Sequence, residues 1–316
     1  MPEFHPELRL GRFIPRLPYR DWNVRLLQRL RIPGSRAPQG MSIENIQVPG
    51  PEGAPPVRLR VYRPDGHGAQ AALFWVHGGG FIQGAPEQDD DRSIEIAREL
   101  GITVVAAAYR LAPDHPYPAP LDDVHAGFRW LVRNAPALGV DPDRIAIGGA
   151  SAGGGLAAGL TLRVHDEGDI RPVFQLLVYP MLDDRTTLRD DVDTRYLRGW
   201  TQQNNRFGWS AYLGREPGGD GTPAYAAPAR RAELGGLPPT WIGVGTNDLF
   251  LAEDTEYARR LEAAGVPCEF VTVPGAFHGF DAFFGKTDVA RDFLRQQIAA
   301  LRPALAATQR PADEGS

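Results

Sequence analysis

Ser151 lies in a context that is typical of a catalytic nucleophile. It is the central residue of the segment 149–153 (GASAG), between the apolar run 145–147 and a stretch rich in Ala, Leu and Gly. Glycines two residues before and after the serine let the backbone pass through a tight strand-to-helix turn, which exposes the hydroxyl at the carboxyl end of the strand. Because a serine hydroxyl is a weak nucleophile at neutral pH, this chemistry needs a general base nearby.

His278 is the candidate for that base. It lies in the segment 274–280 (PGAFHGF), directly after the strand predicted at 269–273. The segment therefore delivers the imidazole to the same edge of a parallel sheet as Ser151. An imidazole can accept a proton near neutral pH, so His278 can deprotonate the serine as it attacks.

Asp248 is the candidate for the acid that orients His278 and stabilises its protonated form. It follows the strand predicted at 241–245. Glu253 and Asp254 are competing acids, but both suit the first turn of the next helix, where carboxylates meet the positive end of the helix dipole. Asp248 is therefore the preferred residue, and the chain order is serine, acid, histidine.

A glycine run provides candidate donors for an oxyanion. The segment 77–81 (HGGGF) directly follows the apolar run 73–76. Each well-placed amide lost from around a tetrahedral intermediate costs roughly 3 kcal/mol of transition-state stabilisation. The candidate donors are the N–H groups of Gly79, Gly80 and Ala152, the last at the start of a helix. We expect His77 to shape this loop through a hydrogen bond rather than to act as a base.

The elements that must position these residues alternate along the chain, which is typical of a mostly parallel sheet with helices on both faces. A Pro/Gly loop too short for a parallel crossover joins the first two strands, so we expect this pair to be antiparallel. The predicted strands are 46–48, 57–62, 73–77, 103–109, 145–148, 174–179, 241–245 and 269–273, and the predicted helices are 92–100, 121–134, 154–167, 253–264 and 286–301.

Two regions interrupt this alternation. Residues 1–44 contain several prolines and no strand pattern. Residues 181–219 carry many charges and a set of aromatic residues at broadly helical spacing, namely Trp200, Phe207, Trp209 and Tyr212. We interpret the two segments as the parts of a cap packed over the strand ends. The core then comprises residues 45–180 and 220–306, and residues 307–316 form a loose tail. We expect replacement of Trp200 or Trp209 by Ala to change acyl-chain preference.

Composition excludes several classes of protein. The chain has 316 residues, of which 42% are hydrophobic and 23% charged, values that are ordinary for a globular protein and not for a disordered or fibrous one. The net charge of −5 gives no global attraction for nucleic acid. The lone Cys268 permits no intramolecular disulfide, and neither a signal peptide nor a membrane span is predicted, so we expect a cytoplasmic protein.

Taken together, these motifs resemble the hormone-sensitive-lipase-like group of α/β-hydrolase carboxylesterases. The resemblance covers residues 77–280 and includes the HGGGF segment, the stretch 109–119 (YRLAPDHPYPA), the serine turn, Asp248 and the segment 278–280. It implies an α/β-hydrolase fold with a two-part helical cap, and hydrolysis of short- to medium-chain carboxylic esters. We expect Arg110, interacting with Asp114, to pin the stretch 109–119, which we interpret as scaffold rather than as part of the catalytic site.

The sequence departs from the family pattern at three points. The residue before the nucleophile is usually acidic and is Ala150 here; the usual Asp-Pro-Leu run is Asp248-Leu249-Phe250; and Ala252 replaces a frequent second acid. No member of the catalytic set is lost, so we expect activity to survive; these departures leave the optimum pH and the acyl preference open.

Three alternatives remain open at this stage. The first is a receptor that binds small molecules. Some relatives with this fold bind small molecules after loss of the catalytic histidine, but His278 is present here. A dinucleotide-binding oxidoreductase would need a G-x-G-x-x-G register that is missing near Gly149. A hydrolase of amides or peptides would use the same three residues. The expected partner is an ester substrate, with no metal and no cofactor, and the sequence also permits a homodimer.

Overall fold

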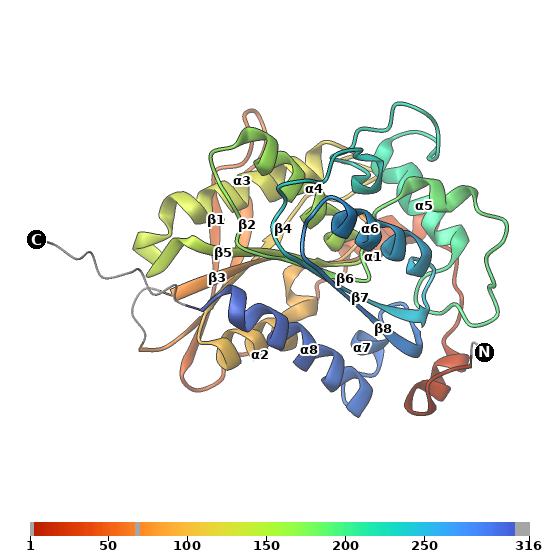
Figure 1. Cartoon of the computed structure of the whole chain (residues 1–316), viewed down its shortest axis with the longest axis horizontal. Helices are drawn as coiled ribbons and strands as arrows, with labels where there is room; N and C mark the ends of the chain where they lie inside the picture. Colours follow the sequence, from red (N-terminus) through yellow and green to blue (C-terminus); the bar gives the residue numbers. More distant parts are fainter. Residues whose placement is uncertain (1–2, 67–69, 307–316) are drawn as a thin grey trace, which may run out of the picture.

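A computed structural model describes residues 3–66 and 70–306; the tail expected at 307–316 lies outside this range. Eight strands form one sheet in the order β1-β2-β4-β3-β5-β6-β7-β8 (Figure 1). Their bounds are β1 (Met41–Val48), β2 (Val57–Pro64), β3 (Gln70–Val76), β4 (Thr103–Ala108), β5 (Val140–Ala150), β6 (Gln175–Val178), β7 (Thr240–Asn247) and β8 (Cys268–Phe277). All eight predicted strands are present, as the resemblance to α/β hydrolases implies.

The sheet is antiparallel at one end and parallel elsewhere. β1 pairs antiparallel with β2, as predicted, and β2 pairs antiparallel with β4. From β4 to β8 every neighbouring pair is parallel. The carboxyl ends of β3, β5, β7 and β8 therefore lie at one edge, where the candidate residues follow them.

Helices cover both faces of the sheet (Figure 1). The helices are α1 (Asp21–Arg29), α2 (Asp90–Leu100), α3 (Ala119–Asn134), α4 (Ala152–Glu167), α5 (Gln202–Leu213), α6 (Leu251–Ala263), α7 (Phe280–Phe283) and α8 (Asp288–Ala304). Short 3₁₀ helices occupy Pro6–Phe13, Pro86–Asp89, Pro136–Leu138, Asp184–Leu188 and Pro228–Arg230. The five predicted helices correspond to α2, α3, α4, α6 and α8.

Two apolar cores lie on opposite faces of the sheet. Side chains of α3, α4 and α6 pack in one core with Phe74 and Ile147. Side chains of α2 and α8 pack in the other core with Trp75 and Trp241. Alternate residues of β3 thus point into different cores, as the two-residue period of a strand requires. The nearly continuous apolar run at 71–76 follows from this burial on both faces.

The amino-terminal segment packs against the segment that contains α5. The Asn204 side chain accepts a hydrogen bond from the Tyr19 N–H (3.0 Å) and donates to the Leu17 carbonyl (3.1 Å). Arg16 donates to the carbonyl of Leu197 at 3.2 Å. These contacts join residues more than 180 positions apart in the sequence.

The expected interaction between Arg110 and Asp114 is wrong. Arg110 instead forms a two-pronged ion pair with Asp123 on α3, at 2.8 and 2.7 Å. Asp114 pairs with Arg25 of α1 at 3.0 Å. Asp123 is buried, so it satisfies the guanidinium in a protected geometry that the exposed Asp114 could not offer. The stretch 109–119 is therefore anchored to α3 and to α1.

Candidate active site

Ser151 lies at the sharp turn between β5 and α4. Its backbone has φ +57° and ψ −122°, a conformation rare for a residue with a side chain. Its N–H donates to the Val178 carbonyl at 2.9 Å. A Cβ at Gly153 would lie 2.1 Å from the Val76 carbonyl oxygen, so only glycine lets α4 approach β3 this closely. The close packing of α4 against β3 at this edge of the sheet therefore requires glycine at position 153.

Ser151, His278 and Asp248 form one hydrogen-bonded chain. His278 Nε2 lies 2.8 Å from Ser151 Oγ, and His278 Nδ1 lies 2.9 Å from Asp248 Oδ2. The other oxygen of Asp248 accepts from the Phe250 N–H at 3.0 Å. All three residues of the chain are buried. The arrangement can move a proton from the hydroxyl to the imidazole while the carboxylate holds the ring in one orientation.

Aromatic rings hold His278 in place on two sides. The Phe250 ring stands edge-on to it with centroids 5.1 Å apart, and the Tyr179 ring lies 4.8 Å away. The Tyr179 hydroxyl donates to Asp281 at 2.8 Å, and Asp281 pairs with Arg92 of α2. Burial raises the pKa of Tyr179 well above its usual value, so its hydroxyl remains a donor.

The amides of the glycine loop have no protein acceptor. Within residues 3–66 and 70–306, neither the Gly79 nor the Gly80 N–H donates a hydrogen bond. Both glycines line the same cavity as Ser151. Gly80 has φ +62°, and a Cβ there would lie 2.0 Å from the Trp200 ring, so the indole packs directly on the loop backbone. Ala152 is the first residue of α4, where N–H groups have no partner within the helix.

His77 is bound to the loop rather than aimed at the serine. Its Nδ1 lies 2.8 Å from the Gly78 carbonyl, and its ring stacks on Tyr109 with centroids 4.3 Å apart. Complete burial lowers the pKa of His77 to about 4. It is therefore neutral at physiological pH and shapes the loop, as the sequence predicted.

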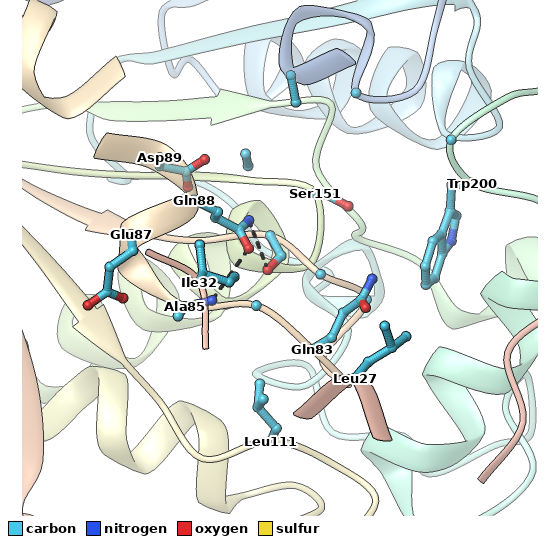
Figure 2. A pocket seen from close by; sticks show the side chains of 18 of the residues that line it. Leu27, Ile32, Gln83, Ala85, Glu87, Gln88, Asp89, Leu111, Ser151 and Trp200 are labelled. Carbon is cyan, nitrogen blue, oxygen red and sulfur yellow. Dashed lines mark hydrogen bonds between the residues drawn. The ribbon is translucent and has the colours of Figure 1, made fainter. Parts of the chain in front are cut away.

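The Ser151 hydroxyl opens into a cavity of about 920 Å³. The segments that line it include the amino-terminal segment around α1, the loop after β3, the Trp200 region and the segment 278–283. Figure 2 shows Ser151 between Trp200 on one side and Asp89 with Gln88 on the other, with Leu27 and Ile32 below. Trp209 does not line the cavity; it lies behind, packed on Phe81 and Tyr212.

The other candidates from the sequence lie outside the cavity. Glu253 and Asp254 fall in the first turn of α6, as predicted, and burial raises the pKa of both well above the usual range. Burial also raises the pKa of the Cys268 thiol to about 12, which removes it as a nucleophile.

No group of three metal-ligating side chains occurs among the described residues. No helix of the described chain has the length and apolarity needed to cross a membrane.

The sequence did not identify Tyr179 and Asp89 as parts of this site. Tyr179 follows β6 directly, and its φ of +35° turns its ring toward His278. Asp89 opens the acidic run 89–91 and lines the cavity. Its position at the end of a predicted strand could have identified Tyr179 as a candidate site residue. For Asp89 no local signal distinguishes it from the two carboxylates that follow.

Comparisons with known proteins agree with this geometry. A model of the alpha/beta hydrolase fold family matches residues 73–282. The chain is 35% identical over 292 residues to Carboxylesterase NlhH of Mycobacterium tuberculosis, covering 88% of each chain. It is 33% identical over 285 residues to Esterase LipI of the same species, covering 88% of this chain and 87% of the relative.

Solved structures give the same result over almost the whole chain. A bacterial heroin esterase superposes with a TM-score of 0.86 at 35% identity, over 97% of this chain and 99% of that one. The hyperthermophilic esterase from the archaeon Pyrobaculum calidifontis superposes with a TM-score of 0.83 at 29% identity, over 96% and 100%. The chain therefore belongs to the α/β-hydrolase family and is a carboxylic ester hydrolase of the hormone-sensitive-lipase type.

Proposed function

We propose that the protein hydrolyses short- to medium-chain carboxylic esters through an acyl-enzyme on Ser151. The observation that carries this proposal is the unbroken chain from Asp248 through His278 to Ser151 at the wall of a 920 Å³ cavity. His278 Nε2 accepts the hydroxyl proton as Ser151 Oγ attacks the ester carbonyl carbon. Asp248 accepts a hydrogen bond from Nδ1–H and stabilises the imidazolium that results.

The acyl-enzyme forms and breaks through two tetrahedral intermediates. The amides of Gly79, Gly80 and Ala152 donate to the oxyanion in both; the first two have no other acceptor among the described residues. The imidazolium of His278 returns its proton to the departing alcohol. It then takes a proton from water, which attacks the acyl carbon and releases the acid.

Residues 1–40 and 181–219 form, in this proposal, a cap over a core of residues 41–180 and 220–306. The boundary lies at residue 40 rather than at the expected residue 44, because β1 of the central sheet already begins at Met41. Two observations support this cap. Both segments contribute cavity-lining side chains, among them Leu27 and Trp200, and the Asn204 hydrogen bonds join them to each other. The Trp200 ring against Gly80 closes one side of the cavity and limits acyl length there.

The test is hydrolysis of p-nitrophenyl esters from acetate to palmitate by the protein and by its Ser151→Ala variant. We expect the highest kcat/KM on acyl chains of roughly two to eight carbons and a loss of about 10⁴- to 10⁶-fold in kcat in the variant. Ser210→Ala, a change on α5 outside the cavity lining, is the matched control. Full activity in the Ser151 variant, or hydrolysis of long chains alone, contradicts the proposal.

A further inference from the structure

An unpaired carboxylate lies in the wall of the catalytic cavity. Asp89, the last residue of the 3₁₀ helix Pro86–Asp89, lines the same cavity as Ser151 (Figure 2). Its Oδ2 accepts a hydrogen bond from the Trp75 indole N–H at 2.8 Å. Its Oδ1 has no hydrogen-bond partner within the described part of the chain, and Asp89 forms no ion pair there.

The charges around Asp89 do not balance. Asp90 is paired with Arg60 at 2.8 Å, and Asp281 is paired with Arg92. Three carboxylates thus face two guanidiniums, and the direct partner of the third carboxylate is a neutral indole. Burial raises the pKa of Asp89, although the nearby Arg92 and the Trp75 hydrogen bond partly oppose that rise. A cation bound in the cavity would supply the missing charge.

The other carboxylate among the described residues that line the cavity is already paired with an arginine. Glu87 lines the cavity but is held by two hydrogen bonds from Arg58, at 2.5 and 3.0 Å. Ala150, next to the nucleophile, lines the cavity with only a methyl group. Position 150 therefore contributes no charge to the cavity, while a carboxylate at position 89 faces the same space.

We propose that Asp89 is an anionic subsite that binds a protonated amine carried by the ester substrate. This inference rests on the proposed function, because the amine reaches Asp89 as part of an ester held at Ser151. An ammonium N–H donates to Oδ1 while Oδ2 remains bound to Trp75, so the subsite needs no rearrangement of its indole partner. The preferred substrates are amino esters.

Matched ester pairs test this subsite. One pair places the amine in the alcohol, with 2-(dimethylamino)ethyl butyrate against its neutral isostere 3-methylbutyl butyrate. The other places it in the acyl part, with ethyl 4-(dimethylamino)butyrate against ethyl 5-methylhexanoate. The readout is the ratio of kcat/KM for the charged and neutral members at pH 7, in the protein and in Asp89→Asn, which keeps an acceptor for Trp75.

We expect the ratio to exceed one for at least one pair and to fall at least tenfold in Asp89→Asn. Asp91→Asn, a neighbouring exposed carboxylate, should leave the ratio as it is. An equal ratio in the protein and in Asp89→Asn for both pairs overturns the subsite, even though hydrolysis of the neutral esters upholds the proposed function. Failure to hydrolyse the neutral esters refutes the proposed function itself.

A separate observation concerns the surface around the cavity mouth. Of the ten large apolar side chains that are exposed among the described residues, eight lie between positions 10 and 32. On α1 and just after it, Trp22, Leu26 and Leu30 follow one another at four-residue spacing with exposed fractions of 68%, 54% and 62%. They share one outward helix face, while Val24 is buried. Leu30 also lines the cavity, as does the exposed Phe283.

This apolar surface is also basic. Residues 10–32, which carry it, contain six arginines and one acidic residue, a balance of +5, whereas the whole chain carries −5. Two copies of the protein meeting through this surface would bring +5 against +5. An apolar helix face flanked by cations instead suits the boundary of a lipid layer that carries negative headgroups.

We further propose that residues 10–32 dock the protein on an anionic lipid surface, so that the cavity mouth faces the lipid. The test is co-sedimentation with vesicles of phosphatidylcholine alone and with 30% phosphatidylglycerol. We expect binding to the anionic vesicles, at least tenfold weaker in the double variant Trp22→Ser/Leu26→Ser and unchanged in Leu188→Ser, whose leucine is equally exposed outside this surface. Neither Trp22 nor Leu26 lines the cavity, so hydrolysis of p-nitrophenyl acetate in free solution should persist.

Three results overturn this docking: no binding to anionic vesicles, equal binding by the double variant, or a dimer in light scattering that the double variant abolishes. The last result would assign the surface to a second copy of the chain.

Discussion

The strand ends that carry Ser151, Asp248 and His278 differ in kind from the segments 1–40 and 181–219, which form the cap in our proposal. At the strand ends, each side chain is placed by a turn within a few residues of a buried strand. In the two segments, position depends on contacts such as Asn204 with Tyr19, between residues 185 positions apart. Local backbone geometry therefore places the three candidate catalytic residues, whereas long-range side-chain contacts determine the shape of the cavity beside them.

The largest expected effect tests the strand-end region. Asp248→Asn should lower kcat on p-nitrophenyl acetate by about 10⁴-fold, because an amide in place of the carboxylate favours the wrong imidazole tautomer and cannot stabilise the imidazolium. The measurement is steady-state kinetics at pH 7. Asp191→Asn, an exposed carboxylate of the other region, should change kcat less than twofold. A similar loss in both variants would remove the distinction between the two regions.

Two tryptophans of the segment 181–219 differ in position, because Trp200 lines the cavity and Trp209 lies in the core behind it. Trp209 is fully buried behind the cavity, so Trp209→Ala should cost about 3–5 kcal/mol of unfolding free energy without changing the order of acyl-chain preference. Trp200 lines the cavity, so Trp200→Ala should shift that preference toward longer acyl chains. Urea unfolding and an acyl ester panel measure the two effects. A changed preference in the Trp209 variant would show that the second layer also shapes the cavity.

Most of the fold and the candidate catalytic chain could be predicted because both depend on local patterns. Buried strands appear as apolar runs, and the glycines around Ser151 mark a close approach of α4 to β3. The partner of Arg110 was predicted wrongly, since sequence proximity favoured Asp114 over the buried Asp123. The sequence-based expectation treated Trp200 and Trp209 alike, because helical spacing does not say which ring faces a cavity.

A smaller effect is the contribution of His77, at the start of the glycine loop, to the pH dependence of the unfolding free energy. The pKa of His77 is about 4 when folded, whereas an unperturbed histidine titrates near 6.5. As pH falls through 6.5 the unfolded chain gains a proton that the folded chain does not, so His77 lowers the unfolding free energy, by about 3 kcal/mol once pH reaches 4. His77→Gln should be less stable at pH 7 but should lack this part of the pH dependence. Urea titrations of both proteins from pH 7 to 4 measure the difference, and parallel curves would contradict it.

The smallest expected effect is that of Leu17→Ala, which we compare with the same change at a buried leucine. Leu17 in the amino-terminal segment is 71% exposed, whereas Leu160 on α4 is fully buried. Leu17→Ala should change the unfolding free energy by less than about 0.5 kcal/mol, because little of its apolar surface leaves water on folding. Leu160→Ala should cost about 2–5 kcal/mol through lost burial and a cavity in the core. If urea unfolding instead shows a loss above about 2 kcal/mol for Leu17→Ala, the side chain is buried in solution. The amino-terminal segment would then be covered there, either by another copy of the chain or by a rearranged cap.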